Sequence, residues 1–352
     1  MSTIPLAGRR PALHLLTTST LIGVLAVALA GCDVLTPGSD GGGVDTSARL
    51  FPAAQNGDRV LIDTGGRVVV HLDGYNRTRP GGEGLTPARR WAGRSIWDFF
   101  DTRGEVAFSV DADEAWAPRG GVARVRVDGR YGFVDLDGRY RVNPGLNDAR
   151  DVREGVARVK TTSWRWGLME PSGTLVVEPQ WGDLGDLRDG RARFEDDDAF
   201  GFIDRTGAEV VPASYDDARE FSDGRAAVRQ GQRWFYIDRD NGRPMGGATF
   251  ISAGDFAEGL APVRTENRWE YVDRDGRRAL DPQFEEARAF ADGRAAVRVD
   301  GRWTFVDRDG ALIADPTFDE VDDFAGGLAA VYVDEKQGYI DRDGQMVWFP
   351  RD

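Results

Sequence analysis

The sequence predicts an all-β fold of tandem antiparallel repeats, each a meander of about 34 residues, arranged like the blades of a β-propeller. Two observations support this prediction. A motif aromatic-x-aromatic-[Val/Ile]-Asp returns every 34 or 35 residues, and Asp-Gly pairs separate short apolar runs. A fixed period of this length is typical of repeat architectures, and Asp-Gly between apolar runs is a strong hairpin signal. An open stack of sheets, similar to a β-solenoid, is the alternative.

Three motifs recur in one phase over residues 121–352. The acidic residue that ends the aromatic motif stands at Asp135, Glu170, Asp204, Asp238, Asp273, Asp307 and Asp341. The second motif, Gly-x-Ala-x-[Val/Phe], starts at Gly121, Gly155, Gly190, Gly224, Gly259, Gly293 and Gly327. The third, aromatic-x-x-[Ala/Val]-x-x-Phe, ends at Phe221, Phe256, Phe290 and Phe324. We expect seven β repeats over 121–352 and degenerate units over 49–120, where the motif survives in part at 97–101 and 62–63.

The repeat at 294–324 shows what one unit contains. Residues 294–299 and 302–307 read as two strands joined by Asp300-Gly301, and 311–314 reads as a third strand. Residues 318–324 fit either a fourth short strand or a turn of helix. Alternate side chains are apolar on both faces of the first two strands, so the sheets must stack on one another. Seven such sheets would close a ring and leave 51–120 outside it.

These motifs resemble the WG repeat of bacterial proteins over about residues 121–349. The Trp-Gly dipeptide itself survives at Trp166-Gly167, while Gly follows Tyr131, Phe200 or Gln337 in other copies. The resemblance implies an all-β repeat used for binding or scaffolding. It implies no shared catalytic residues and no common ligand.

The N-terminus has the pattern of an export signal. Residues 1–31 contain Arg9 and Arg10, no acidic residue, and an apolar run over 21–30. The segment Leu29-Ala30-Gly31-Cys32 resembles the lipobox of bacterial lipoproteins, which implies cleavage before Cys32 and lipidation of that residue. Residues 32–48 are then the lipidated Cys and a flexible Gly- and Ser-rich tether. We expect an anchored protein of the bacterial cell membrane that faces the periplasm or the exterior; the choice of inner or outer membrane stays open.

The sequence offers little support for catalysis or cofactors. The chain has one Cys and two His, of which only His71 follows the expected signal peptide, so we expect no catalytic residue, metal site or cofactor. The formal charge of −14 makes nucleic acid a poor partner. Four copies of Asp-x-Asp-Gly, which start at Asp135, Asp273, Asp307 and Asp341, fit structural turns, with a weak cation site as the alternative.

Residues that depart from the repeat are the better candidates for an interface. Trp91, Trp116, Trp164 and Trp348 fall outside the repeated aromatic position, and Asp196-Asp197-Asp198 interrupts a hairpin. We expect a non-catalytic binding or scaffold module for an envelope protein or peptide, or for a glycan. An envelope hydrolase and a divalent-cation-dependent binding module are the alternatives. The pattern does not identify the ligand or the face that binds it.

Overall fold

The computed structural model describes residues 49–55, 57–91, 95–281 and 283–349, and in these residues every regular element is a β-strand. The strands form nine antiparallel sheets, which we number as blades 1 to 9. Blade 1 contains β1 (Phe51–Gln55), β2 (Asp58–Ile62) and β3 (Val68–His71); blade 2 contains β4 (Tyr75–Thr78), β5 (Thr86–Arg90), β6 (Ile96–Phe100) and β7 (Val106–Asp111); and blade 3 contains β8 (Glu114–Ala115), β9 (Val122–Val127), β10 (Arg130–Asp135) and β11 (Tyr140–Leu146). Blade 4 contains β12 (Asp148–Ala149), β13 (Ala157–Lys160), β14 (Trp166–Met169) and β15 (Leu175–Trp181); blade 5 contains β16 (Asp183–Leu184), β17 (Arg191–Asp196), β18 (Ala199–Asp204) and β19 (Glu209–Tyr215); and blade 6 contains β20 (Asp217–Ala218), β21 (Arg225–Gln230) and β22 (Arg233–Asp238). Blade 7 contains β23 (Ser252–Ala253), β24 (Leu260–Arg264) and β25 (Trp269–Asp273); blade 8 contains β26 (Glu286–Ala287), β27 (Ala295–Val299) and β28 (Arg302–Val306); and blade 9 contains β29 (Glu320–Val321), β30 (Leu328–Val333), β31 (Lys336–Asp341) and β32 (Met346–Trp348).

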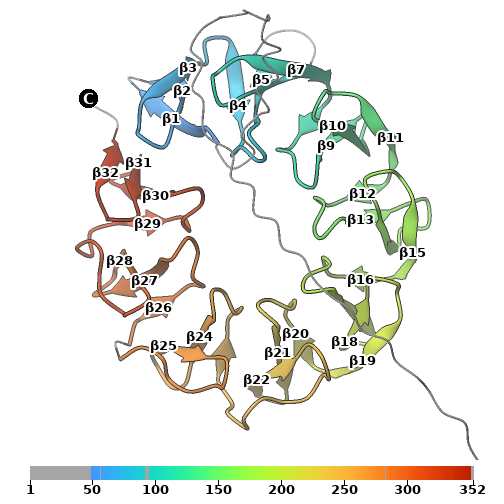
Figure 1. The fold of residues 1–352 in the computed structure, drawn as a ribbon, viewed down its shortest axis with the longest axis vertical. Coiled ribbons are helices and arrows are strands. Elements are labelled where there is room, and N and C mark those ends of the chain that lie inside the picture. Colours follow the sequence, from blue (N-terminus) through green and yellow to red (C-terminus); the bar gives the residue numbers. More distant parts are fainter. Residues whose placement is uncertain (1–48, 56, 92–94, 282, 350–352) are drawn as a thin grey trace, which may run out of the picture. The chain divides into compact units, whose positions relative to one another are not determined.

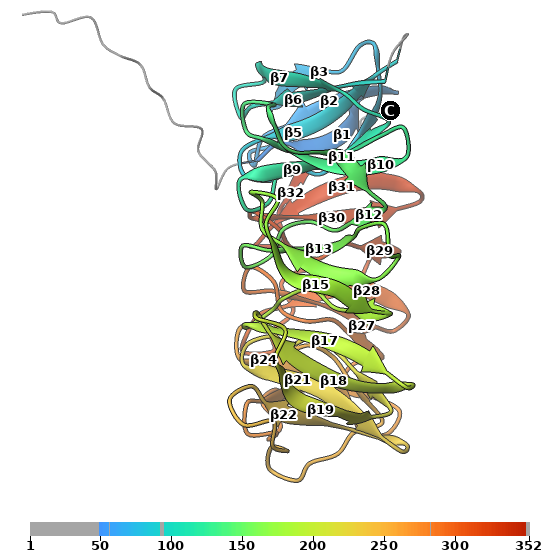
Figure 2. The same ribbon diagram turned by 90° about the vertical axis from the view of Figure 1, so that its right-hand side faces the viewer.

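The blades of this part of the chain follow one another around a ring, as in a β-propeller (Figure 1). A complete blade has four strands in sequence order, which we call A to D; β11, β15 and β19 are D strands and lie at the outer margin (Figure 1). In an antiparallel meander the A–B and C–D turns lie on one face of the ring and the B–C hairpins on the other. We call these the turn face and the hairpin face. Seen from the side, the sheets stand beside one another along the ring (Figure 2).

The prediction of a seven-fold ring that excludes residues 51–120 is wrong. These residues form blades 1 and 2, and the ring has nine blades. Blade 9 packs directly on blade 1: the Tyr339 hydroxyl donates to the Pro52 carbonyl at 2.7 Å, and the rings of Phe51 and Tyr339 lie 5.6 Å apart. The two ends of the repeat array therefore meet, and the predicted propeller is confirmed over the open stack.

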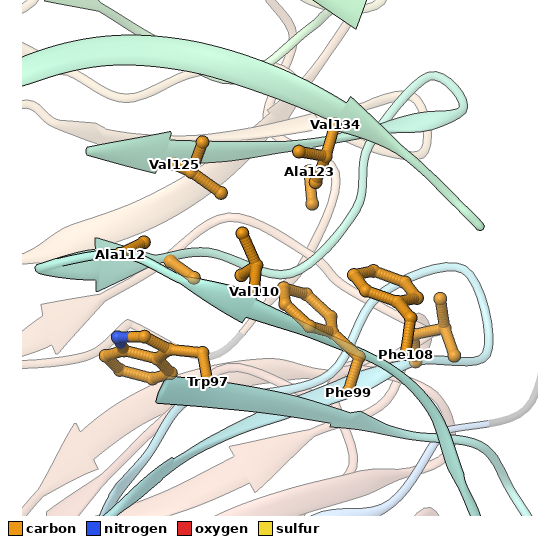
Figure 3. Packing of buried hydrophobic residues seen from close by; sticks show 10 residues of the cluster. Trp97, Phe99, Phe108, Val110, Ala112, Ala123, Val125 and Val134 are labelled. Carbon is orange, nitrogen blue, oxygen red and sulfur yellow. The ribbon is translucent and has the colours of Figure 1, made fainter. Parts of the chain in front are cut away.

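Stacking of both faces of each sheet is also confirmed. In blade 8, Trp303 and Phe305 pack against Ala329 and Val331 of blade 9. Ala295, Val297 and Val306 belong to the other cluster, with Leu260 and Tyr271 of blade 7. Figure 3 shows the same arrangement between blades 2 and 3, where Trp97 and Val110 face Ala123 and Val125. The core is thus a series of layers between neighbouring blades.

The last Phe of the third motif crosses each of four such layers. The rings of Phe221, Phe256, Phe290 and Phe324 meet an aromatic side chain of the preceding blade at centroid distances of 4.7, 4.7, 5.1 and 4.8 Å, all edge to face. Residues 318–324, for which sequence left strand or helix open, contain the two-residue strand β29 and then this Phe. The motif therefore places one aromatic wedge between successive blades.

In blades 3, 4 and 5 the glycine of the Trp-Gly position makes room for a regular D strand. A Cβ at Gly132, Gly167 or Gly201 would lie 2.4–2.6 Å from a carbonyl oxygen of the D strand, which bulges over the glycine in all three blades. Close approach of two backbones without a side chain between them needs glycine. The Gly of the repeat therefore makes room for the fourth strand.

Blades 6, 7 and 8 carry a side chain at this position, and each has three strands. The residues are Phe235, Glu270 and Thr304, and the outer segments of these blades touch strand C through isolated bridges. The third strand predicted at 311–314 is accordingly wrong: Leu312 makes one bridge, to Val306, and the Thr304 hydroxyl donates to the Ala314 carbonyl at 2.6 Å.

Candidate binding site at the inner turns

The A–B turns of blades 2 to 9 share a short, tight geometry. The first and fourth residues of each turn bridge each other, and the two central residues have positive φ. The third residue is a Gly, which in blades 3 to 9 starts the second motif, and the residue before it is acidic in six blades: Glu83, Glu154, Asp189, Asp223, Glu258 and Asp292. Such turns match the twist of the strands they join, and their left-handed backbone is strained at a non-glycine residue. Asp-Gly is a favoured pair in such turns, whereas the glutamates at 83, 154 and 258 are not explained by turn preference.

Each acidic side chain accepts hydrogen bonds from the backbone of the next blade's turn. Glu83 accepts from Gly120 at 2.6 Å and Gly121 at 2.9 Å, Glu154 from Asp189 at 2.6 Å and Gly190 at 2.8 Å, Asp189 from Gly224 at 2.6 Å, Asp223 from Gly259 at 2.5 Å, Glu258 from Gly293 at 3.0 Å, and Asp292 from Gly327 at 2.9 Å. This role was not predicted from the sequence, although the pattern shows the acidic residue before the repeated Gly. These contacts tie consecutive blades together on the turn face.

Arginines of the C–D turns complete the network in blades 7 to 9. Arg274 pairs with Asp223, Arg308 with Glu258 at 3.7 Å, and Arg342 with Asp292 at 3.2 Å, each across to the preceding blade. Burial alone would raise the pKa of Asp292, but the Gly327 amide and the Arg342 guanidinium outweigh it and hold the pKa below its ordinary value. The carboxylate is therefore ionised where it ties blades 8 and 9.

We expect Asp292→Asn to lower the free energy of unfolding by about 1–2 kcal/mol at pH 7, because it weakens a charge-assisted bond and removes an ion pair. A group with a lowered pKa in the folded state stabilises the fold above its unfolded pKa of about 4, and this contribution is lost as the pH falls through the folded pKa. Urea unfolding at pH 7 and at pH 3 should therefore show the difference between variant and wild type shrinking in acid. The control Asp300→Asn, in an exposed hairpin, should change little; a difference for Asp292→Asn that stays constant with pH would contradict the role of its charge.

The inner turns of blades 2 to 6, with Arg49, line a cavity of about 460 Å³. The first residue of these turns breaks the repeat: it is Arg119, Arg153 and Arg188 in blades 3, 4 and 5. The corresponding residues are Ser222 in blade 6 and alanine in blades 7 to 9, at 257, 291 and 325. The inner rim is therefore cationic in three consecutive blades, and the other five turns begin with a small residue: Gly82, Ser222 or one of the three alanines. The backbone geometry of the turns, which is the same throughout, does not require this asymmetry.

The three arginines are held in place but keep exposed surface. Arg119 Nε lies 3.8 Å from Asp151, Arg153 Nε lies 3.2 Å from Asp186, and Arg188 Nε lies 2.6 Å from Glu220, each acid being on the following blade. The Arg119 side chain is 51% exposed and makes the longest of these contacts. The cavity is thus lined by oriented guanidinium groups and by the acidic residues of the turns, a surface suited to polar groups of a ligand.

The Asp-x-Asp-Gly sequences form turns. In the copies at Asp135, Asp273, Asp307 and Asp341, Oδ1 of the first Asp accepts from the amides two and four residues later, at 2.8–3.1 Å. These backbone bonds hold the pKa of Asp135 below its ordinary value despite some desolvation. Within the described ranges, no three His, Cys, Asp or Glu side chains are grouped as metal ligands.

The four tryptophans outside the repeated position have different surroundings. Trp91 and Trp164 are exposed, at 74% and 68%, on B–C hairpins of blades 2 and 4. Trp116 lies under the guanidinium groups of Arg79 and Arg124, at 4.6 and 3.9 Å from the ring centroid, and Trp348 packs at the contact of blades 9 and 1. The structure therefore leaves two of these side chains free to meet a partner, both on the hairpin face and away from the inner turns.

Two other sequence candidates lie away from the cavity. Asp196–Asp198 forms the B–C hairpin turn of blade 5, with positive φ at Asp197 and Asp198. His71 is exposed at the end of β3. Cys32 lies outside the described residues, as do the rest of the expected signal peptide and tether. The part of the chain that the structure describes contains no helix capable of spanning a bilayer.

Blade 2 contains a buried polar cluster that sequence reasoning did not find. Asp98, which is fully buried, replaces the Gly of the Trp-Gly position and accepts from Tyr75 at 2.6 Å, from Ser109 at 2.5 Å, and from Arg90 through two nitrogens at 2.7 and 2.9 Å. Burial and the neighbouring Asp98 carboxylate raise the pKa of Tyr75 to about 12. Four donor bonds satisfy the carboxylate, so the cluster is a structural substitute for the glycine bulge of the other four-stranded blades.

Comparison with known proteins agrees with this architecture. Among solved structures, a crystal structure of the eukaryotic initiation factor matches with a TM-score of 0.51 at 10% identity, over 87% of this chain and 85% of that one. BamB from Moraxella catarrhalis matches with a TM-score of 0.45 at 14% identity, over 76% of this chain and 94% of that one. Identities this low concern the fold alone. No curated protein sequence matches the chain.

A sequence model described as WG containing repeat matches at residues 131–162, 166–198, 200–234, 234–269, 271–303 and 303–336. These matches cover more than half of the chain and fall in blades 3 to 9. Their phase is that of the aromatic motif, whose Gly makes room for the D strand. The chain belongs to the WG-repeat family.

Proposed function

We propose that this WG-repeat propeller is a non-catalytic binding module of the bacterial cell envelope, anchored by lipid at Cys32, that holds a protein or peptide partner at its inner turns. The fold is that of a repeat-based binding or scaffold module. The observation that carries the proposal is the asymmetric inner rim, because its first turn residue changes from Arg to Ala around a ring whose backbone geometry repeats.

The chemistry of the cavity favours a polypeptide. Its lining combines arginines with turn carboxylates and backbone groups, which suit the mixed donors and acceptors of a peptide chain. The lipobox-like segment at 29–32 supports the anchor. Multiple acyl chains at Cys32 would give stable membrane attachment, and the segment 33–48 would hold the ring off the bilayer.

Photo-crosslinking in intact cells tests the proposal. A photoreactive residue is placed at Arg119 in the cavity, and at Leu312 as an exposed control on blade 8, in the wild-type chain and with Cys32→Ala. We expect one or a few defined protein adducts from position 119, none of them from position 312, and loss of these adducts with Cys32→Ala. Labelling of the wild type, but not of Cys32→Ala, with a fatty-acid analogue reports the anchor separately.

Two outcomes would overturn the proposal. Defined adducts from Leu312 with none from Arg119 would move the partner to the outside of the ring. The absence of adducts from both positions, in a protein that is folded and labelled by the fatty-acid analogue, would exclude a protein partner at the inner turns.

A further inference from the structure

The turn of blade 4 lacks the carboxylate that its neighbours receive. In blade 3 the amides of Gly120 and Gly121 bind the two oxygens of Glu83, and in blade 5 those of Asp189 and Gly190 bind the two oxygens of Glu154. The equivalent amides in blade 4 belong to Glu154 and Gly155. The residue that would bind them is Gly120, which has no side chain. Among the residues that the structure describes, neither amide has a hydrogen-bond acceptor.

The backbone of this turn is nevertheless in the receiving conformation. The φ angles of Glu154 and Gly155 are 47° and 77°, against 50° and 69° for Asp189 and Gly190. Two adjacent amides in this arrangement each meet one oxygen of a single carboxylate, as the two filled copies show. Oriented amides of this kind form anion-binding concavities. Blades 3 and 5 thus contain copies in which one carboxylate meets both amides, and in the described part of the chain the copy between them, in blade 4, has no such carboxylate.

The chain is built so that it does not fill this copy itself. A Cβ on Gly120 would lie 2.4 Å from a methyl of Val152, so a side chain there would collide with blade 4. Gly120 and Glu154 both line the cavity, together with Arg119 and Arg153. Arg205 adds a third guanidinium: it donates to the Glu154 carbonyl at 3.0 Å and lies 3.5 Å from the Cβ position of Gly155. Arg205, which also pairs with Glu170 at 3.1 Å, therefore places a guanidinium group beside this turn.

We propose that the amides of Glu154 and Gly155 bind a carboxylate of the partner, either an acidic side chain or a C-terminus, with the rest of the partner segment in the cavity beside Arg119 and Arg153. The inference rests on the proposed binding function and names the chemistry of the ligand. The partner's carboxylate takes the place that Glu83 and Glu154 occupy in the neighbouring blades. The two amides carry no net charge, so the attraction between opposite charges comes from the arginines.

Selective isotope labelling isolates the amide in question. Labelling the carbonyl of Glu with ¹³C and the nitrogen of Gly with ¹⁵N selects Glu-Gly pairs, which occur at 83–84, 154–155 and 258–259. Gly155 is the open site, and Gly259, whose amide already binds Asp223, is the matched control. The substitutions Glu154→Asp and Glu258→Asp each remove one signal and so assign them. The full chain is titrated with three tripeptides: Ac-Ala-Gln-Ala-OH, Ac-Ala-Glu-Ala-NH₂ and Ac-Ala-Gln-Ala-NH₂.

We expect the Gly155 signal to move saturably with one or both of the peptides that carry a carboxylate, and not with the third. The first peptide reports a C-terminus and the second an acidic side chain. Arg119→Ala should weaken the binding about threefold to tenfold. Gly120→Glu combined with Val152→Ala should shift Gly155 without added peptide and abolish the titration.

The proposal fails if Gly155 responds equally to all three peptides, if it does not respond, or if Gly259 moves as much as Gly155. These readings use the wild-type chain, so they stand even where the double variant does not fold. The proposed function is tested separately: adducts from position 119 in cells together with an unresponsive Gly155 would keep the binding module and discard the carboxylate site.

Discussion

Phe256→Ala is expected to lower the free energy of unfolding by about 3–5 kcal/mol, the usual cost of removing a fully buried Phe. The side chain is 1% exposed, and its ring meets that of Tyr236 in the preceding blade at 4.7 Å. The truncation leaves a cavity between blades 6 and 7, where two rigid sheets have little freedom to collapse. Equilibrium unfolding in urea, followed by tryptophan fluorescence, measures the change.

The repeat supplies the control for this prediction. Blade 5 has Leu187 where blade 7 has Phe256, and Leu187 is also buried. Phe256→Leu should therefore cost about half as much as Phe256→Ala or less, because most of the volume stays filled. Equal losses for both substitutions would mean that the edge-to-face contact with Tyr236, rather than the filled volume, stabilises the layer.

The fold was predicted correctly where a sequence pattern indicates directly which side chains are buried. The alternation of apolar residues in 294–307 led to sheets that stack on both faces, and the clusters around Phe305 and Val306 confirm it. The number of blades was wrong because blades 1 and 2 keep the buried positions but change the motif residues. In blade 2 the Gly-x-Ala motif is altered and Asp98 replaces the usual glycine, although Phe99 stays fully buried.

The candidate site was less accessible to sequence reasoning. The acidic residue before each repeated Gly was visible, yet its partner lies about 35 residues away on the next blade, and that contact depends on how the blades stack. The cavity needs five blades placed around one centre, which a period alone does not specify. The exchange of Arg119, Arg153 and Arg188 for alanine in later copies was readable, but only the ring shows that these positions share one rim.

Gly167→Ala is expected to lower the free energy of unfolding by about 2–4 kcal/mol, although Ala is the smallest substitution available. The new Cβ would lie 2.4 Å from the Val177 carbonyl oxygen and 2.9 Å from the Pro179 nitrogen, both backbone atoms of β15. Strand β15 must then separate from β14. Blades 6 to 8 have no regular D strand, so the rest of blade 4 should stay folded. Hydrogen exchange should therefore show lost protection over Leu175–Trp181 and retained protection over Ala157–Lys160.

The matched control is Gly182→Ala, at the residue that directly follows the same D strand. No atom lies within 4 Å of the Cβ position of Gly182, and its φ is not positive, so alanine fits without strain. We expect Gly182→Ala to leave stability unchanged or slightly raised, because Ala restricts the unfolded chain more than Gly. Equal destabilisation by both substitutions would show that the loss comes from glycine flexibility in general. Destabilisation by Gly167→Ala alone, with exchange confined to the outer strand, would assign the Gly of the Trp-Gly pair in blade 4 to the close approach of two backbones, a feature that blades 6, 7 and 8 lack together with a regular fourth strand.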